Sequence, residues 1–149
     1  RMLTTSVARL GKIAVGVAVA GLLAGSASAE LSSALVSPYL KVQVALAHDT
    51  TDGVSEAATA IATAAKELGD DGQNLAVAAA MLAEAQTIAA ARDAFGSLSE
   101  ALIEYGTDTG FGDLRVAYCP MVDKSWVQED GWIANPFYGA MMLTCGEFK

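Results

Sequence analysis

Histidine and cysteine are scarce in this chain. Its 149 residues include one histidine, His48, and two cysteines, Cys119 and Cys145. The sequence contains no HExxH motif, no phosphate-binding loop and no set of nucleophile, base and acid. A zinc site normally uses more Cys and His side chains than this chain offers near its cysteine pair. We therefore expect the protein to be neither an enzyme nor a zinc protein.

Long apolar runs are absent beyond the N-terminus. The run over residues 13–23 follows Arg9 and Lys12 and has about the length of a signal-peptide core. It is too short to cross a bilayer about 30 Å thick, which needs roughly 20 residues. The small residues Ala27-Ser28-Ala29 then form a signal-peptidase pattern. The sequence therefore predicts a signal peptide over residues 1–29 that is cleaved after Ala29.

A lipid anchor is not expected on the mature chain. Leu23-Ala24-Gly25 resembles a bacterial lipobox, but Ser26 stands where the acylated cysteine would be. We therefore expect a soluble, periplasmic protein that does not insert into a membrane after its signal is removed.

Basic residues are also few. Cleavage would remove Arg1, Arg9 and Lys12, which leaves six basic residues against 17 acidic ones and a net charge of −11. Such a surface repels nucleic acid and anionic lipid head groups, because both carry negative charge. We expect no nucleic-acid partner, whereas cations and basic partners are compatible with this charge.

Residues 30–106 are rich in alanine and nearly free of aromatic side chains. Their apolar residues recur at three- and four-residue spacing, which is typical of amphipathic helices. The first helix either begins at Pro38 or is longer and has a kink at this proline. Three more helices are expected over about 54–68, 74–86 and 88–105. The sequence thus predicts an all-α fold, an antiparallel bundle of three to four helices.

The boundary between the last two predicted helices is open. Thr87 could cap the fourth helix, but neither Gly nor Pro separates it from the third, so the two could be one long helix. Gly106 is expected to end the fourth helix. Residues 107–112 contain two glycines and predict a linker.

Residues 113–149 have a different composition and carry six of the chain's ten aromatic residues. Residues 114–118 alternate in hydropathy and predict a short strand. Residues 123–134 are polar and turn-like, and residues 137–143 could form a strand or a single helical turn. We expect a short, irregular cap, with room for a β-strand, that packs on the bundle and forms one domain with it.

Four sulfur atoms could converge in this cap. Cys119 and Met121 would point to one side of an extended chain, and Met142 and Cys145 would share one face of a helical turn. Thiolate and thioether are soft donors, which favour Cu(I) and similar ions. The pattern predicts a metal site with two thiolates and two thioethers.

A disulfide is the alternative interpretation of the same two cysteines. Exported cysteine pairs usually bridge, because their compartment is oxidising. A bridge between Cys119 and Cys145 would close a loop of 26 residues, which corresponds to about 3 kcal/mol in the chain-entropy description. The methionines would then be flexible core fillers. The two interpretations also overlap, since a reversible bridge could gate a metal site.

Four further residues are secondary candidates. His48 and Met141 are possible additional metal ligands, although a histidine at a helix end more often complements the helix dipole. Trp126 and Tyr138 are candidate aromatic shields for a bound ion, against the more common use of such rings in packing.

The C-terminal motifs resemble those of an uncharacterised bacterial domain family that occurs alone and attached to periplasmic adaptors of copper/silver efflux systems. The shared pattern is Cys119-Pro120-Met121, then Trp126-Val127-Gln128, then residues 133–146 with Asn135-Pro136 and Cys145-Gly146. Arg92-Asp93-Ala94-Phe95 in the helical part is also similar. The resemblance implies a role in handling heavy metals.

We therefore expect an exported protein that binds Cu(I) or a similar soft metal ion and sequesters it or hands it to a periplasmic efflux adaptor. The alternative is a disulfide-stapled periplasmic interaction module that holds no metal.

Overall fold

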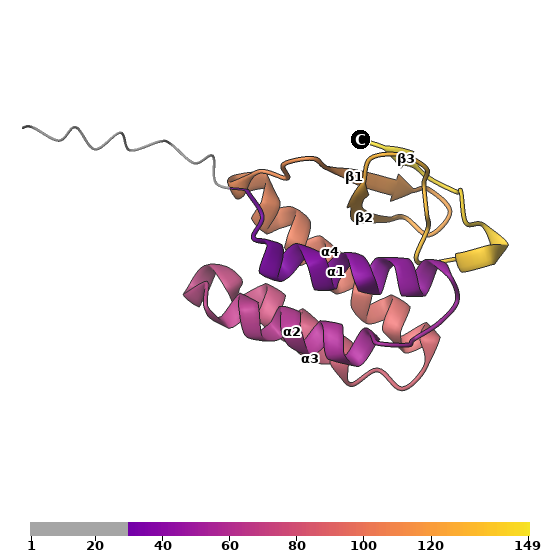
Figure 1. Cartoon of the computed structure of the whole chain (residues 1–149). Helices are drawn as coiled ribbons and strands as arrows, with labels where there is room; N and C mark the ends of the chain where they lie inside the picture. Colours follow the sequence, from indigo (N-terminus) through magenta and orange to yellow (C-terminus); the bar gives the residue numbers. More distant parts are fainter. Residues whose placement is uncertain (1–29) are drawn as a thin grey trace, which may run out of the picture.

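A computed structural model describes residues 30–149, and the expected signal peptide over residues 1–29 lies outside them. The described chain is a bundle of four α-helices that is covered on one side by a small sheet (Figure 1). The helices are α1 (Ser33–Ala47), α2 (Val54–Lys66), α3 (Gln73–Ala83) and α4 (Ile88–Thr109). The strands are β1 (Leu114–Cys119), β2 (Lys124–Glu129) and β3 (Glu147–Phe148), and two short 3-10 helices are η1 (Gly69–Gly72) and η2 (Gly139–Met141).

Short polar side chains cap two of the helices. The hydroxyl of Ser32 accepts a hydrogen bond from the N–H of Ala34, and that of Thr87 accepts one from Ala90. These bonds satisfy backbone donors that have no partner within the helix. Pro38 lies inside α1, so this helix begins ahead of it. The prediction of up to four helices is confirmed, and Thr87 separates α3 from α4.

The end of α4 differs from the prediction. The helix continues past Gly106 to Thr109 and is capped at Gly110, so it enters the segment expected to be a linker. Gly106 is buried, and the ring of Phe111 lies so close that a side chain at position 106 would overlap it. This glycine allows a close approach and does not end the helix.

The three strands form an antiparallel sheet in the order β2-β1-β3. The expected strand near residues 114–118 is confirmed as β1. The turn-like prediction is wrong for β2, where three consecutive residues, Trp126 to Gln128, are buried and no period-two alternation marks a strand. The region of residues 137–143 contains the helical turn η2. The fold is therefore mostly helical with a small sheet, and it is not purely all-α.

The sheet lies against α1 and α4, on the side of these helices that faces away from α2 and α3 (Figure 1). A row of aromatic rings joins the layers. Tyr39 of α1 stacks on Phe95 of α4 with ring centroids 4.9 Å apart, and Phe137 of the cap contacts both Phe95 and Trp126 of β2. The cap is thereby packed into the same core as the bundle.

A buried hydroxyl also links the layers. The side chain of Tyr39 makes a 2.7 Å hydrogen bond with Ser99 of α4 and accepts one from the backbone N–H of Val127 in β2. Burial raises the pKa of Tyr39 well above its usual range, so this hydroxyl stays protonated.

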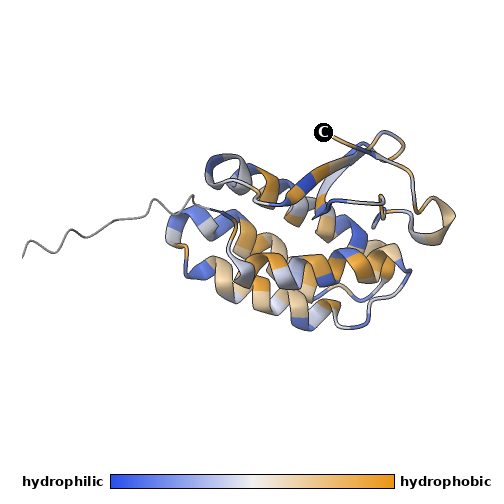
Figure 2. Cartoon of the chain, turned by 45° about the horizontal axis from the view of Figure 1, so that its top comes forward, coloured by the Kyte–Doolittle hydropathy of each residue, from blue (hydrophilic) through white to orange (hydrophobic). Residues whose placement is uncertain are grey.

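Hydrophilic and hydrophobic residues alternate around the helices, as amphipathic packing requires (Figure 2). Among the helices of residues 30–149, none combines the length and the apolar character that a bilayer span requires.

Candidate dithiol site

The sheet brings the two cysteines together. Cys119 is the last residue of β1, and β3 pairs with β1 so that Tyr118 lies opposite Glu147. One further step of this antiparallel register places Cys119 beside the segment that contains Cys145. Their sulfur atoms are 3.2 Å apart, and both cysteines are free thiols in this structure. Cys119 is fully buried, whereas Cys145 is half-buried.

The two thiols have unequal acidity. Burial alone would raise the pKa of Cys119, but hydrogen bonds from Cys145, from the backbone N–H groups of Val122 and Met121, and from Asn135 hold it below its usual range. Its hydrogen bond to Cys119 raises the pKa of Cys145, with a contribution from burial. Cys119 is therefore the more acidic thiol of the pair, and Cys145 is the less acidic one.

Asn135 is buried within the loop over residues 130–146, which joins β2 to β3 and carries Cys145. Its side-chain oxygen accepts hydrogen bonds from the N–H groups of Phe137 and Tyr138, at 2.8 Å and 3.3 Å. Its side-chain nitrogen donates a 2.8 Å bond to the carbonyl of Cys145, and the same amide group also bonds to Cys119. One amide therefore shapes the loop and orients both cysteines.

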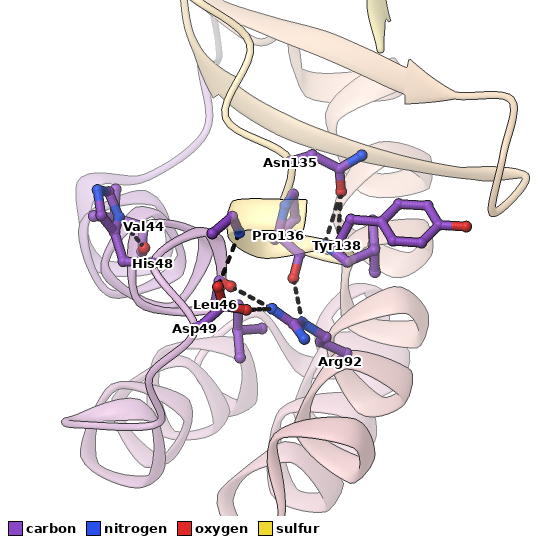
Figure 3. A network of polar contacts seen from close by, with 10 residues as sticks. Val44, Leu46, His48, Asp49, Arg92, Asn135, Pro136 and Tyr138 are labelled. Carbon is purple, nitrogen blue, oxygen red and sulfur yellow. Dashed lines mark hydrogen bonds and ion pairs between the residues drawn. The ribbon is translucent and has the colours of Figure 1, made fainter. Parts of the chain in front are cut away.

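Arg92 fastens the neighbouring part of the loop to the bundle (Figure 3). From α4, it donates to the carbonyl of Pro136 at 2.8 Å and to the carbonyl of Leu46 at 2.9 Å. It also pairs with Asp49 at 2.6 Å, and the second carboxylate oxygen of Asp49 accepts from the N–H of Ala140. We name Arg92 and Asp49 the clamp, because they join α1, α4 and the loop.

Gly139 lets the loop approach the clamp closely. Its φ of 57° lies in the left-handed region, and a side chain there would collide with the Asp49 carboxylate and the Arg92 guanidinium. The hydrogen bond from Arg92, followed by that from Ala140, holds the pKa of Asp49 below its usual value. The clamp is thus an ionised pair at neutral pH.

Gln128 fixes the other end of the loop. Its side-chain oxygen accepts bonds from the indole N–H of Trp126 and the backbone N–H of Ala134, and its nitrogen donates to the carbonyl of Trp132. The edge of the Trp126 indole lies against Gly146, the residue after Cys145. Trp126 is fully buried and is therefore positioned to exclude water from this side of the pair.

The methionines near the cysteine pair differ in local structure and in exposure. Met121 lies in the β1–β2 turn, so the extended chain expected between Cys119 and Met121 is absent, and its side chain is 62% exposed. Met142 and Cys145 bound a tight turn in which the N–H of Cys145 donates to the carbonyl of Met142 at 3.0 Å. Met142 is half-buried, and Met141 is 85% exposed.

The other predicted candidates take structural positions. His48 is the exposed C-cap of α1, and its Nδ1 bonds to the carbonyl of Val44. Tyr138 is half-buried in the loop, and its backbone N–H bonds to Asn135. Within residues 30–149, no group of three or more His, Cys, Asp and Glu side chains has an arrangement suited to a metal. His48 therefore does not join the two cysteines as a third ligand in this arrangement.

Several residues that position the pair were missed as functional residues. Arg92, Gln128 and Asn135 stand within the quoted sequence motifs, so the signal was present, but their partners are distant backbone groups that a sequence does not reveal. Asp49 lies outside these motifs, and no sequence signal marks it.

Comparison with known proteins gave one family. The model described as "Protein of unknown function (DUF3347)" matches residues 35–113, which extend from α1 to the segment just before β1. No curated protein and no solved structure matched the chain significantly.

Proposed function

Because this chain belongs to the DUF3347 family of proteins of unknown function, we propose its role from the dithiol itself: it is an exported, periplasmic binding protein for Cu(I) or a similar soft metal ion. Cys119 and Cys145 are the principal ligands, and Met121 and Met142 supply additional thioethers. The protein sequesters the ion or passes it to an efflux system.

The observation that carries this proposal is the 3.2 Å distance between the two sulfurs. A metal–sulfur bond measures about 2.3 Å for zinc, the best-documented case, so a single ion can contact two sulfurs at this spacing. Two cysteine sulfurs, each with a methionine two or three residues away in the sequence, suit a soft ion better than a hard one.

The unequal acidity of the pair also favours binding. A metal takes thiolates, so binding must displace the thiol protons. The setting of Cys119 stabilises its thiolate, so its proton is easier to displace than the proton of Cys145. The fixed loop around Asn135 holds both ligands in place before the ion arrives.

A competition experiment tests the ligand set. Reduced, anaerobic protein is titrated with Cu(I) against a coloured Cu(I) chelator, and the same is done for Cys119→Ser, Cys145→Ser, Met121→Leu and Met142→Leu. We expect either cysteine variant to lose competitive binding and the methionine variants to bind more weakly. Met81→Leu, at an exposed methionine of α3, is the matched control and should leave the affinity unchanged. Equal affinity of the wild type and the cysteine variants would refute the proposal.

The disulfide remains a second candidate function for the same pair, because the two sulfurs are already adjacent. A bond of about 2.05 Å would require them to approach by roughly 1.1 Å. The protein would then be a stapled interaction module without metal. Counting free thiols in unfolded, unreduced protein taken from the periplasm decides this point, and two free thiols would exclude the staple.

A further inference from the structure

A continuous groove runs along the surface between α3 and α4. It is made of three cavities of about 370 Å³ each. The first and second cavities share Asn74, Ala101 and Glu104, and the second and third share Met81 and Ser97. We call this feature the α3–α4 groove. No residue of the cap lines it, so it is separate from the dithiol.

The centre of the groove is apolar and accessible. Val77 and Met81 of α3 are 57% and 60% exposed there, which is unusual for large apolar side chains on a helix that already packs against two others. Small residues, Ala94 and Ala101, line the facing side on α4. Small side chains allow another helix to approach closely, and exposed apolar side chains gathered in one groove are typical of a binding surface.

The rim of the groove has one sign of charge. Every charged residue that lines it is acidic: Asp70, Asp71, Glu84, Asp93, Glu100, Glu104 and Asp108. The Lys and Arg residues of the described chain all lie elsewhere: Lys41, Lys66, Arg92, Arg115, Lys124 and Lys149. The groove therefore selects for an occupant with basic flanks.

We propose that the α3–α4 groove docks a basic amphipathic helix of a partner protein. An apolar stripe on that helix would cover Val77 and Met81, and its Lys or Arg residues would face the acidic rim. A second copy of this chain is a poor occupant, because residues 30–149 carry a net charge of −11. An anionic membrane is repelled for the same reason. The α4 residues that line the groove run from Ala90 to Thr109, about 29 Å along the helix, so a helix of about five turns would cover the groove.

A designed peptide tests the proposal. The probe is a fluorescein-labelled helical peptide of about 18 residues, with Leu at positions i, i+3, i+4 and i+7 and Lys on both flanks. Its binding to the intact protein is measured by fluorescence anisotropy at low and high salt. We expect saturable binding that weakens with salt, since the rim charges are screened. The same peptide with Glu in place of Lys should not bind.

Protein variants locate the site. Met81→Asp and Glu100→Lys should each weaken binding by about tenfold or more. Val44→Asp and Glu129→Lys, which make the same kinds of change outside the groove, should leave binding unchanged. Circular dichroism checks that each variant is folded; because all four positions are exposed, we expect no loss of structure. Absence of saturable binding, or equal effects of the groove and control variants, would overturn the proposal. So would a dimer of the wild type in sedimentation analysis that Met81→Asp dissociates.

Discussion

The side-chain amide of Asn135 donates a 2.8 Å hydrogen bond to the backbone carbonyl of Cys145. The cysteine that is only half-buried is therefore held by a residue that is completely buried. The same side chain accepts bonds from the loop and helps to lower the pKa of Cys119, so loop shape and thiol acidity both depend on Asn135, and each can be measured separately.

Replacing Asn135 with Ala should destabilise the reduced protein by roughly 2–4 kcal/mol, because a carbonyl and two backbone N–H groups lose their partner inside the structure. Urea denaturation under reducing conditions measures the free energy of unfolding. Asn74→Ala, at an exposed asparagine of α3, is the control and should change it by less than about 0.5 kcal/mol. A similar loss in both variants would contradict the central role of Asn135.

Thiolate absorbance near 240 nm should rise in two steps as the pH increases. The first step, at a pKa below the usual cysteine range, belongs mainly to Cys119, and the second, above it, to Cys145. Cys145→Ser keeps a donor to Cys119 and should preserve a low first pKa, whereas Cys145→Ala removes the donor and should raise it. A single step with an amplitude of two thiols in the wild type would show that the pair is not asymmetric.

The same asymmetry fixes the sign of the pH dependence of stability. A lowered pKa of Cys119 in the folded state stabilises the protein above the unfolded-state pKa, and this contribution is lost as the pH falls through the folded-state pKa. The raised pKa of Cys145 acts in the opposite sense, since ionising it costs more in the folded state. Reduced protein should therefore lose stability when the pH rises into the range where Cys145 ionises, and Cys145→Ser should not show this loss.

Arg92→Lys should destabilise the protein by about 1–3 kcal/mol, because lysine cannot reach two carbonyls and a carboxylate with one planar group. Arg115→Lys is a matched control, since Arg115 pairs with Asp130 on the open surface and such pairs contribute about 0–1 kcal/mol. Thermal unfolding of both variants gives the comparison. An equal shift in the melting temperatures would show that the clamp is no stronger than a surface ion pair.

Tyr39→Phe should lower the free energy of unfolding by roughly 1–3 kcal/mol. The Ser99 hydroxyl and the N–H of Val127 would stay buried but lose their hydrogen-bond partner. The control is Tyr105→Phe, which changes a half-buried tyrosine of α4. A double-mutant cycle with Ser99→Ala separates the coupling of Tyr39 to Ser99 from its coupling to β2. A negligible change in Tyr39→Phe would mean that this hydroxyl does not tie the sheet to the bundle.

The helical part of the fold could be predicted because its apolar residues repeat with a helical period and Thr87 is a recognisable cap. β2 could not, because Trp126, Val127 and Gln128 are buried together and leave no alternation. The role of Gly106 was predicted wrongly, because a glycine that ends a helix and a glycine that makes room for an aromatic ring are identical in the sequence. Only the partner, Phe111, distinguishes the two roles.

For the site, the sequence predicted that Cys119 and Cys145 belong together, and the structure places them in contact. It did not predict the position of Met121, because the extended step from Cys119 breaks at the turn after β1. The polar residues around the pair act on backbone carbonyls and N–H groups, which are common to every residue type. No pattern of side chains reveals such partners, so Asn135, Gln128 and the clamp required the folded chain.

The pairing of β3 with β1 also bears on the order in which the molecule assembles. The β1–β2 hairpin is local, whereas β3 returns to β1 through the long loop that contains Asn135, so we expect Cys119 and Cys145 to meet late, across 26 residues. An unfolded chain keeps these two thiols far apart on average. A metal ion or an oxidant that acts on both thiols at once therefore finds them adjacent mainly in the folded molecule and stabilises it through that preference.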